Sequence, residues 1–281
     1  MKLLRFGEPG AEKPGAVDAD GRIRDLSSVI SDITADTIAD GSFARLAGVD
    51  LTALPVVADG VRIGPPIRRI GNFLAIGLNY ADHAEETGAE IPAEPILFNK
   101  APSCISGPYD DVILPPDSEK SDWEVELAFV IGKEASFVSE GDALDHVAAF
   151  TICNDISERS YQLERGGQWM KGKCCPTFGP LGPWLVTPDE VPDPQSLSLW
   201  LELNGERVQN GSTRTMIFPI AEIVSYLSRF MRLEPGDLVT TGTPPGVGLG
   251  FKPPKYLKRG DVMKLGIEGM GVQQQTVRQA I

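Results

Sequence analysis

From Ile70 onward the chain alternates short apolar runs with glycine and proline turns, and this alternation constrains the fold more than any other feature. The runs are rich in β-branched and apolar residues, and turn residues follow each of them. The pattern therefore predicts a β-rich core in which helices are few. The runs are FLAIGL, ILF, VELAFVIG, AFTICND, LWLELNG, LVTTG and VMKLGIEG.

Two helices are expected to interrupt the predicted strands, and both are interpreted as packing elements. One is expected at Glu140–Ala149 and the other at about Phe218–Met231. The second follows Pro219, which suits the first turn of a helix, and its apolar residues recur at helical spacing. These residues are Ile220, Ile223, Val224, Leu227 and Phe230.

Residues 1–65 are interpreted as a small N-terminal β/α domain and residues 66–281 as the main domain. Apolar stretches at Leu3–Phe6 and Ile23–Leu26 flank an Asp20-Gly21 turn signal, which favours strands joined by a hairpin. Mixed helical character then extends to Ala47. Two adjacent prolines at 65–66 are taken as the linker between the domains.

Charge and apolar patterning restrict the partners of this chain of 281 residues. Its formal net charge of −13 and pI near 4.7 disfavour nucleic acid and anionic membrane surfaces. The longest apolar runs are too short to span a bilayer and no secretory apolar region develops, so a cytoplasmic location is expected. The cysteines at 104, 153, 174 and 175 lack zinc-ligand spacing and are expected to be reduced thiols.

Three carboxylates at the ends of apolar strands form the densest chemical signal. Glu124 and Glu126 alternate along one predicted strand, so they face the same way about 7 Å apart. An isolated pair of this kind is usually exposed to solvent, but Asp155 ends a second apolar strand. Three hard oxygen ligands favour Mg²⁺, Mn²⁺ or Ca²⁺ over zinc. A bound cation would also let so acidic a protein bind a keto acid.

His83 is the more informative of the two histidines. Glu86 follows it by three residues on the same face of a predicted short helix, which Asn79 or Asp82 could cap and Gly88 could end. Such a pair can act as a general base that activates water, although an incidental pair on a surface helix is the alternative. His146 has no comparable partner and is interpreted as structural.

Basic residues cluster after Asp155 in segments rich in glycine and proline. Arg159, Lys171 and Lys173 are the candidates, and a lysine there could stabilise an enolate or oxyanion, unless these are scattered surface cations. Thr241 and Thr243 lie in TTGTPPGVGLG, a loop that could bind carboxylate oxygens but does not match a phosphate-binding loop.

Taken together, these motifs resemble the fumarylacetoacetate hydrolase family over residues 70–250. The matching segments are GLNYADHAEE, PILFNKAPSCISGP, DWEVELAFVIGK, NDISERSYQ, GQWMKGK, TFGPLGPWLV and LEPGDLVTTGTPPGVG. The resemblance implies a β-roll of mixed sheets with a small N-terminal domain, hence a mainly β fold with some α (α+β), and a homodimer. It also assigns residue roles. In this assignment the ligands of Mg²⁺ are Glu124, Glu126 and Asp155. The water-activating pair on a lid helix is His83 and Glu86, and the electrophilic helper is Lys173. The substrate or supporting contacts are Arg159, Gln162, Lys100 and Thr243.

The resemblance also implies a reaction. Length and the segments RGGQWMKGK and GPLGPWLVTPDE are similar to hydrolases of 2,4-diketo-3-deoxy-L-rhamnonate or -fuconate, which yield pyruvate and lactate. Acylpyruvate hydrolysis, oxaloacetate decarboxylation, hydroxymuconate isomerisation and non-catalytic keto-acid binding stay open as alternatives. Cys174, Cys175 and Pro176 depart from the family pattern after Lys173, which affects the expected pocket wall.

Overall fold

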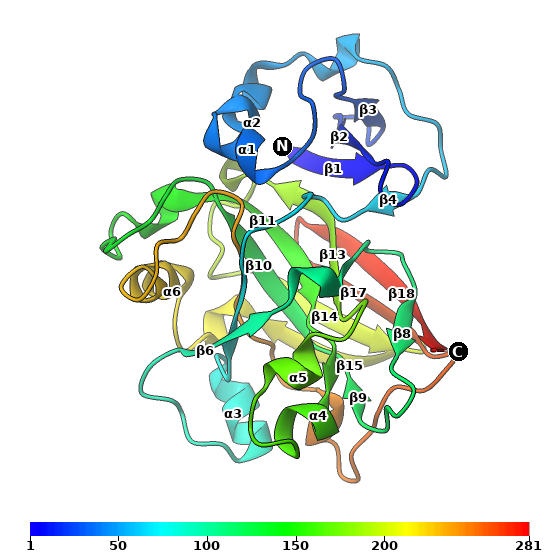
Figure 1. Ribbon diagram of the computed structural model, residues 1–281, viewed down its shortest axis with the longest axis vertical. Coiled ribbons are helices and arrows are strands. Elements are labelled where there is room, and N and C mark those ends of the chain that lie inside the picture. Colours follow the sequence, from blue (N-terminus) through cyan, green and yellow to red (C-terminus); the bar gives the residue numbers. More distant parts are fainter. Residues whose placement is uncertain (281) are drawn as a thin grey trace.

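Two β-sheets packed face to face form the body of the protein, and the computed structural model describes residues 1–280 (Figure 1). The larger sheet is mixed and runs β3-β2-β1-β13-β11-β10-β16-β5-β6, while β4 pairs with β1 and β7 pairs with β13. Most neighbours in it are antiparallel, but β16–β5 and β13–β7 are parallel. Its strands are β1 (Lys2–Phe6), β2 (Lys13–Val17), β3 (Ile23–Asp25), β4 (Ile63–Gly64), β5 (Phe73–Gly77), β6 (Ile96–Lys100), β7 (Ile105–Ser106), β10 (Val125–Ile131), β11 (Val147–Asn154), β13 (Gly179–Val186) and β16 (Leu238–Thr240).

The smaller sheet covers one face of the larger one. It runs β15-β14-β17-β18-β8, and its strands β14, β17 and β18 contact β10, β11 and β13. Facing apolar side chains such as Leu127, Leu201 and Leu265 are buried in this interior. Its strands are β8 (Val112–Leu114), β14 (Ser198–Leu203), β15 (Glu206–Ser212), β17 (Val262–Ile267) and β18 (Gly271–Gln279), and a separate short pair joins β9 (Ser121–Asp122) to β12 (Ser157–Glu158).

Helices are short and lie at the periphery of the sheets (Figure 1). Among residues 1–280, no helix combines the length and the apolar character that crossing a bilayer requires. The α-helices are α1 (Ala35–Ala39), α2 (Ser42–Arg45), α3 (Ala81–Thr87), α4 (Arg159–Leu163), α5 (Met170–Lys173) and α6 (Ile220–Leu227). The 3₁₀ turns are η1 (Leu46–Gly48), η2 (Leu51–Ala53), η3 (Pro102–Cys104), η4 (Ala143–His146), η5 (Pro188–Glu190), η6 (Thr213–Thr215) and η7 (Gly248–Gly250).

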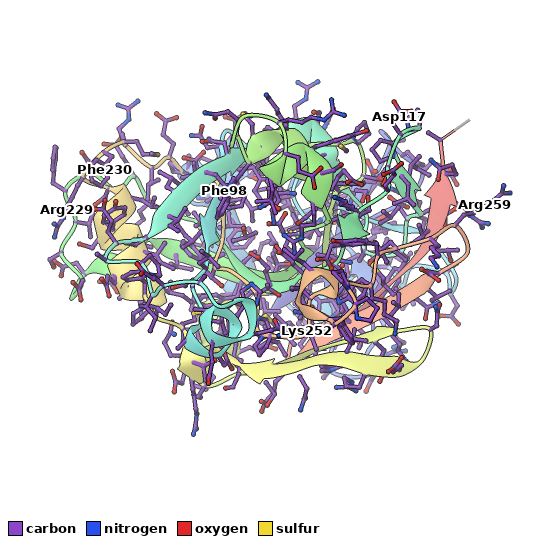
Figure 2. All side chains as sticks on the ribbon, turned by 90° about the horizontal axis from the view of Figure 1, so that it is seen from below. Phe98, Asp117, Arg229, Phe230, Lys252 and Arg259 are labelled. Carbon is purple, nitrogen blue, oxygen red and sulfur yellow. The ribbon has the colours of Figure 1, made fainter. Side chains whose placement is uncertain are left out.

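The predicted mainly β fold is confirmed, but one of the two predicted core helices is wrong. Residues 143–146 form only the 3₁₀ turn η4, and strand β11 begins at Val147. Pairing of β11 with both β10 and β13 overrides the local helical pattern, because a central strand satisfies its backbone hydrogen bonds on two sides. The other predicted helix exists as α6, shorter than expected, with Pro219 as its N-cap and Phe230 exposed beyond its end (Figure 2).

The N-terminal strands are continuous with the larger sheet. β1 pairs with β13 through Lys2 and Leu3, and β2 and β3 extend the sheet outward. In Figure 1 these strands and α1 and α2 gather at one end, away from α3, α4 and α5. The boundary near residue 65 stays a prediction.

Strands β10 and β11 bring the acidic motifs to one edge of the sheet. They are antiparallel, with Val125 opposite Asn154, so the start of β10 meets the end of β11. Every residue of β10 is buried, which explains why this strand is an almost continuous apolar run. The residues that flank this pair are thereby held by two rigid central strands.

Candidate active site

Glu124, Glu126 and Asp155 form a buried acidic triad at that edge. Glu124 directly precedes β10, Glu126 lies within it and Asp155 directly follows β11. The Asp155 N–H donates to the Glu124 carbonyl at 2.8 Å, which continues the pairing of the two strands. One carboxylate oxygen from each residue lies within 4.8 Å of the others. The three side chains therefore converge as the sequence predicts.

The electrostatics of the triad fit a bound divalent cation. Burial raises the pKa of Glu124, but Lys173 and Arg159 outweigh burial and lower it to about 2. Burial, together with the charges of Asp155 and Glu124, instead raises the pKa of Glu126 well above its usual range. Glu126 accepts the Gly242 N–H at 3.0 Å, and no ion pair joins it to a described residue. A buried carboxylate in this setting needs a positive partner, and carboxylate oxygens suit Mg²⁺, Mn²⁺ or Ca²⁺.

Helix α3 presents the second chemical group, the His83–Glu86 pair. Nδ1 of His83 lies 3.1 Å from Oε2 of Glu86, and Oε1 of Glu86 accepts the Gly246 N–H at 2.8 Å. Gly88 ends the helix with a φ of 67°, as expected, whereas the N-cap is Tyr80 without a side-chain cap. The Asn79 side chain instead bonds the backbone of Phe218 and Thr241, so the expected capping by Asn79 is wrong. Oδ1 of Asp82 accepts the His83 N–H at 3.1 Å within the first turn, although Asp82 is not the N-cap residue.

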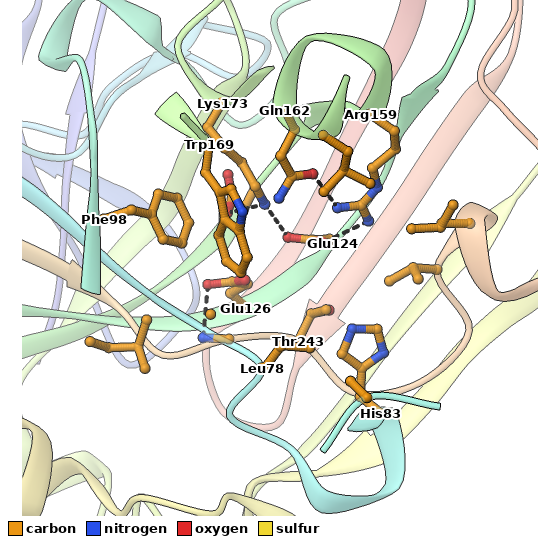
Figure 3. Close-up of a pocket in the computed structure, with 18 residues that line it drawn as sticks. Leu78, His83, Phe98, Glu124, Glu126, Arg159, Gln162, Trp169, Lys173 and Thr243 are labelled. Carbon is orange, nitrogen blue, oxygen red and sulfur yellow. Dashed lines mark hydrogen bonds and ion pairs between the residues drawn. The ribbon is translucent and has the colours of Figure 1, made fainter. Parts of the chain in front are cut away.

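The triad and His83 open onto one cavity of about 360 Å³, a volume typical of a small-molecule site (Figure 3). It lies where the loop after β5, helices α4 and α5 and the loop after β16 meet. Figure 3 shows Lys173, Gln162 and Arg159 pointing toward Glu124 from one side, with His83 on another. The lining residues are Ile76, Gly77, Leu78, His83, Ala89, Phe98, Glu124, Glu126, Asp155, Arg159, Gln162, Leu163, Trp169, Lys173, Gly242, Thr243, Val247 and Leu249.

Two residues assigned by the resemblance support the cavity without lining it. Lys100 is fully buried, and its Nζ donates to Asp155 Oδ1 at 2.5 Å and to the Lys173 carbonyl. Glu86 bonds to His83 and is not among the lining residues. Thr243 lines the cavity, but its hydroxyl is used within the protein, because it donates to the Val125 carbonyl at 2.9 Å and accepts from Gln209.

Asp122 holds the cavity lining together, a role that the sequence alone does not reveal. Its carboxylate is completely buried and accepts hydrogen bonds from the Arg159 side chain and from the N–H groups of Trp123, Gly248 and Leu249. It therefore joins Arg159 to the loop that carries two lining residues. Its position directly before the W-E-V-E motif is the only signal that could have suggested this role.

The departure from the family pattern at Cys174, Cys175 and Pro176 lies outside the described cavity lining. Sγ of Cys174 accepts the Ala101 N–H at 3.0 Å, so it packs against the segment after β6. The four cysteines are free thiols, as expected.

Comparison with known proteins identifies the class. Residues 72–278 match the family model described as fumarylacetoacetate (FAA) hydrolase C-terminal. The chain is 58% identical over 281 residues, all of both chains, to a Burkholderia multivorans protein that is only provisionally described as a hydrolase. The protein belongs to the fumarylacetoacetate hydrolase family.

Solved structures of the family share the fold over the whole chain. A fumarylacetoacetate hydrolase from Exiguobacterium antarcticum has a TM-score of 0.89 and 37% identity, with 100% of both chains covered. Maleylpyruvate hydrolase from Sphingobium, in complex with manganese(II) and pyruvate, has a TM-score of 0.83 and 28% identity, also with full coverage. A 5-carboxymethyl-2-hydroxymuconate delta-isomerase from Mycobacterium smegmatis has a TM-score of 0.77 and 30% identity, again with full coverage.

Proposed function

We propose that the protein is a divalent-metal-dependent hydrolase that cleaves a carbon–carbon bond of a 2,4-diketo acid and releases pyruvate. The observation that carries the proposal is that a buried acidic triad and a His–Glu pair open onto the same cavity. The Sphingobium maleylpyruvate hydrolase, whose structure holds manganese(II) and pyruvate, supports both the metal and the product. Mg²⁺ is proposed as the ion in the cell.

Glu124, Glu126 and Asp155 would hold the ion, which as a Lewis acid would polarise a 2-keto acid. His83 accepts a proton from water, and Glu86 orients its ring through Nδ1 and stabilises the imidazolium. The water oxygen adds to the C4 carbonyl, the C3–C4 bond breaks, and its electron pair forms the enolate of pyruvate. Lys173 is held at the triad by Glu124 (2.5 Å) and Asp155 (2.7 Å), where its charge stabilises that enolate until C3 is protonated.

The more specific candidate substrate is 2,4-diketo-3-deoxy-L-rhamnonate or the corresponding fuconate, which would yield pyruvate and lactate. The segments RGGQWMKGK and GPLGPWLVTPDE support it by resemblance. Isomerisation is the second candidate, since the Mycobacterium smegmatis relative is named as a hydroxymuconate isomerase. An isomerase needs a base but no attacking water, and it breaks no carbon–carbon bond. Release of pyruvate therefore distinguishes hydrolysis from isomerisation.

Pyruvate release tests the proposal directly. It is measured with 2,4-diketo-3-deoxy-L-rhamnonate, acetylpyruvate and oxaloacetate, in Mg²⁺ and in EDTA, for wild type, His83→Ala and His146→Ala. His146 is the matched control, because its Nδ1 lies 3.3 Å from the Lys133 carbonyl and it does not line the cavity. The expected result is EDTA-sensitive release from the diketo acids that is lost only in His83→Ala.

Other outcomes redirect the assignment. Activity on oxaloacetate alone indicates a decarboxylase. Failure to release pyruvate from any of the three acids contradicts the hydrolase proposal and makes isomerisation or keto-acid binding the next function to test.

A further inference from the structure

Every cation among the described residues that line the cavity is already paired with a carboxylate of the protein. Arg159 contacts Asp122 at 2.8 Å and Glu124 at 2.7 Å. Lys173 contacts Glu124 at 2.5 Å and Asp155 at 2.7 Å. All five side chains are buried, so solvent screens these pairs little. A second anionic group on a substrate would therefore find no uncommitted lysine or arginine in this lining.

Apart from the triad and the residues that contact it, the lining is largely apolar. Phe98 and Trp169 pack edge to face with ring centroids 5.4 Å apart, and the Trp169 ring lies directly over Gly77, where a Cβ would come within 2.3 Å of it. We name this surface the apolar wall. It consists of Ile76, Leu78, Ala89, Phe98, Leu163, Trp169, Val247 and Leu249.

Part of the apolar wall lies beside His83. Leu249 belongs to η7, which packs against α3, and Figure 2 shows these two elements next to each other. The bond from the Gly246 N–H to Glu86 ties the same loop to α3. In the proposed reaction His83 acts at the carbonyl that carries the acyl group. The acyl end of the substrate consequently extends past His83 toward Val247 and Leu249.

We propose that the cavity selects 2,4-diketo acids with a single carboxylate, whose acyl group ends in an alkyl carbon, and rejects those with a second carboxylate at that end. This inference rests on the proposed function for the orientation of the substrate. Each alkyl carbon that becomes buried raises affinity about fourfold, whereas a carboxylate against the apolar wall loses its hydration and finds no uncommitted lysine or arginine among the described residues that line this cavity. Acylpyruvates and 6-deoxy sugar diketo acids belong to the accepted class.

A matched pair of acids tests the proposal. 2,4-Dioxoheptanoate and 2,4-dioxoheptanedioate have the same carbon chain and differ only in whether the acyl end is a methyl group or a carboxylate. With Mg²⁺ and wild type, we expect kcat/KM for pyruvate release to favour the monocarboxylate by roughly 100-fold or more, mainly through KM. Binding of both acids to His83→Ala is measured by calorimetry and should show the same preference.

Leu163→Arg tests the role of the apolar wall. Leu163 lines the cavity at the end of α4 and is 49% exposed, so a longer, charged side chain can be accommodated there. The new cation should reduce the preference for the monocarboxylate at least tenfold, whereas Leu163→Gln, which adds polarity without charge, should not. Leu249→Arg, with Leu249→Gln as its control, is measured alongside Leu163→Arg, because Leu249 lies where the acyl end is expected.

The results distinguish the two proposals. Similar affinity of both acids for His83→Ala overturns the selectivity, whatever the turnover. A preference that no arginine variant reduces overturns the assignment to the apolar wall. Selective binding without pyruvate release by wild type refutes the hydrolase function but supports the monocarboxylate site.

Discussion

Replacing Asp122 with asparagine should destabilise the protein far more than removing one surface charge. Oδ1 of Asp122 accepts from the N–H groups of Trp123 at 2.8 Å and Gly248 at 2.6 Å. Oδ2 accepts from Arg159 Nε at 2.9 Å and from the Leu249 N–H at 3.0 Å, and Arg159 also contacts it at 2.8 Å. In Asp122→Asn, Oδ1 can still accept its two N–H groups, but an NH₂ group replaces Oδ2. That NH₂ group would face three donors, two from the Arg159 guanidinium and one from the Leu249 backbone.

The size of the effect follows from these contacts. Breaking one side of a buried ion pair costs about 3–5 kcal/mol, because it leaves a buried charge without its partner. Arg159 keeps Glu124 at 2.7 Å and Gln162 at 3.0 Å, so the lower end of this range applies. We expect the free energy of unfolding to fall by about 3 kcal/mol, which lowers Tm by roughly 6–10 °C in a protein of this size.

Urea unfolding followed by circular dichroism, in EDTA so that metal binding does not contribute, measures the change. Asp20→Asn is the matched control, because Asp20 also pairs with an arginine, Arg22 at 2.6 Å, but its side chain is 72% exposed. The control should lose less than about 1 kcal/mol. Equal losses in the two variants would refute the reasoning, since they would mean that burial adds nothing to the Asp122 contacts.

Three further predictions concern the site. Glu86→Gln and His83→Ala should each lower kcat by roughly 10²–10⁴-fold while Mn²⁺ affinity stays as in wild type; weaker binding of Mn²⁺ in calorimetry would contradict a purely catalytic role. Glu126→Ala should abolish the rise in Tm that Mn²⁺ gives the wild type, since the triad loses a ligand oxygen, and a retained rise would place the metal elsewhere. Gly172→Ala should cost about 1–3 kcal/mol in urea unfolding, because a Cβ there would lie 2.4 Å from the Glu158 carbonyl, whereas Gly48→Ala, with open space around it, should change stability little.

The local chemistry of the site could be predicted from the sequence. Alternation along a strand predicts that Glu124 and Glu126 face the same way, and helical spacing predicts that His83 meets Glu86. Both relations depend only on neighbours within a single element, and the structure shows both. The many ordered motifs also indicated the family, and with it the mixed β-sheets.

Relations between distant segments could not be predicted in the same way. The pattern at Glu140–Ala149 predicts a helix that continues past Val147. In the structure Val147 instead begins strand β11, because pairing with β10 and β13 decides its conformation. Asp122 similarly looks like an ordinary turn residue until Arg159 and the loop at Gly248 reach it across 37 and 126 positions of sequence.

The sequence by itself thus determined which residues are candidates for the chemistry, because their types and short spacings are local properties of one strand or one helix. Only the tertiary structure decided which charges remain available to a ligand. Arg159 and Lys173 look like free cations in the sequence, but folding brings them against Glu124 and its neighbours. Pairing of buried charges depends on contacts at a few ångströms between segments far apart in the chain, and these form only when the sheet assembles.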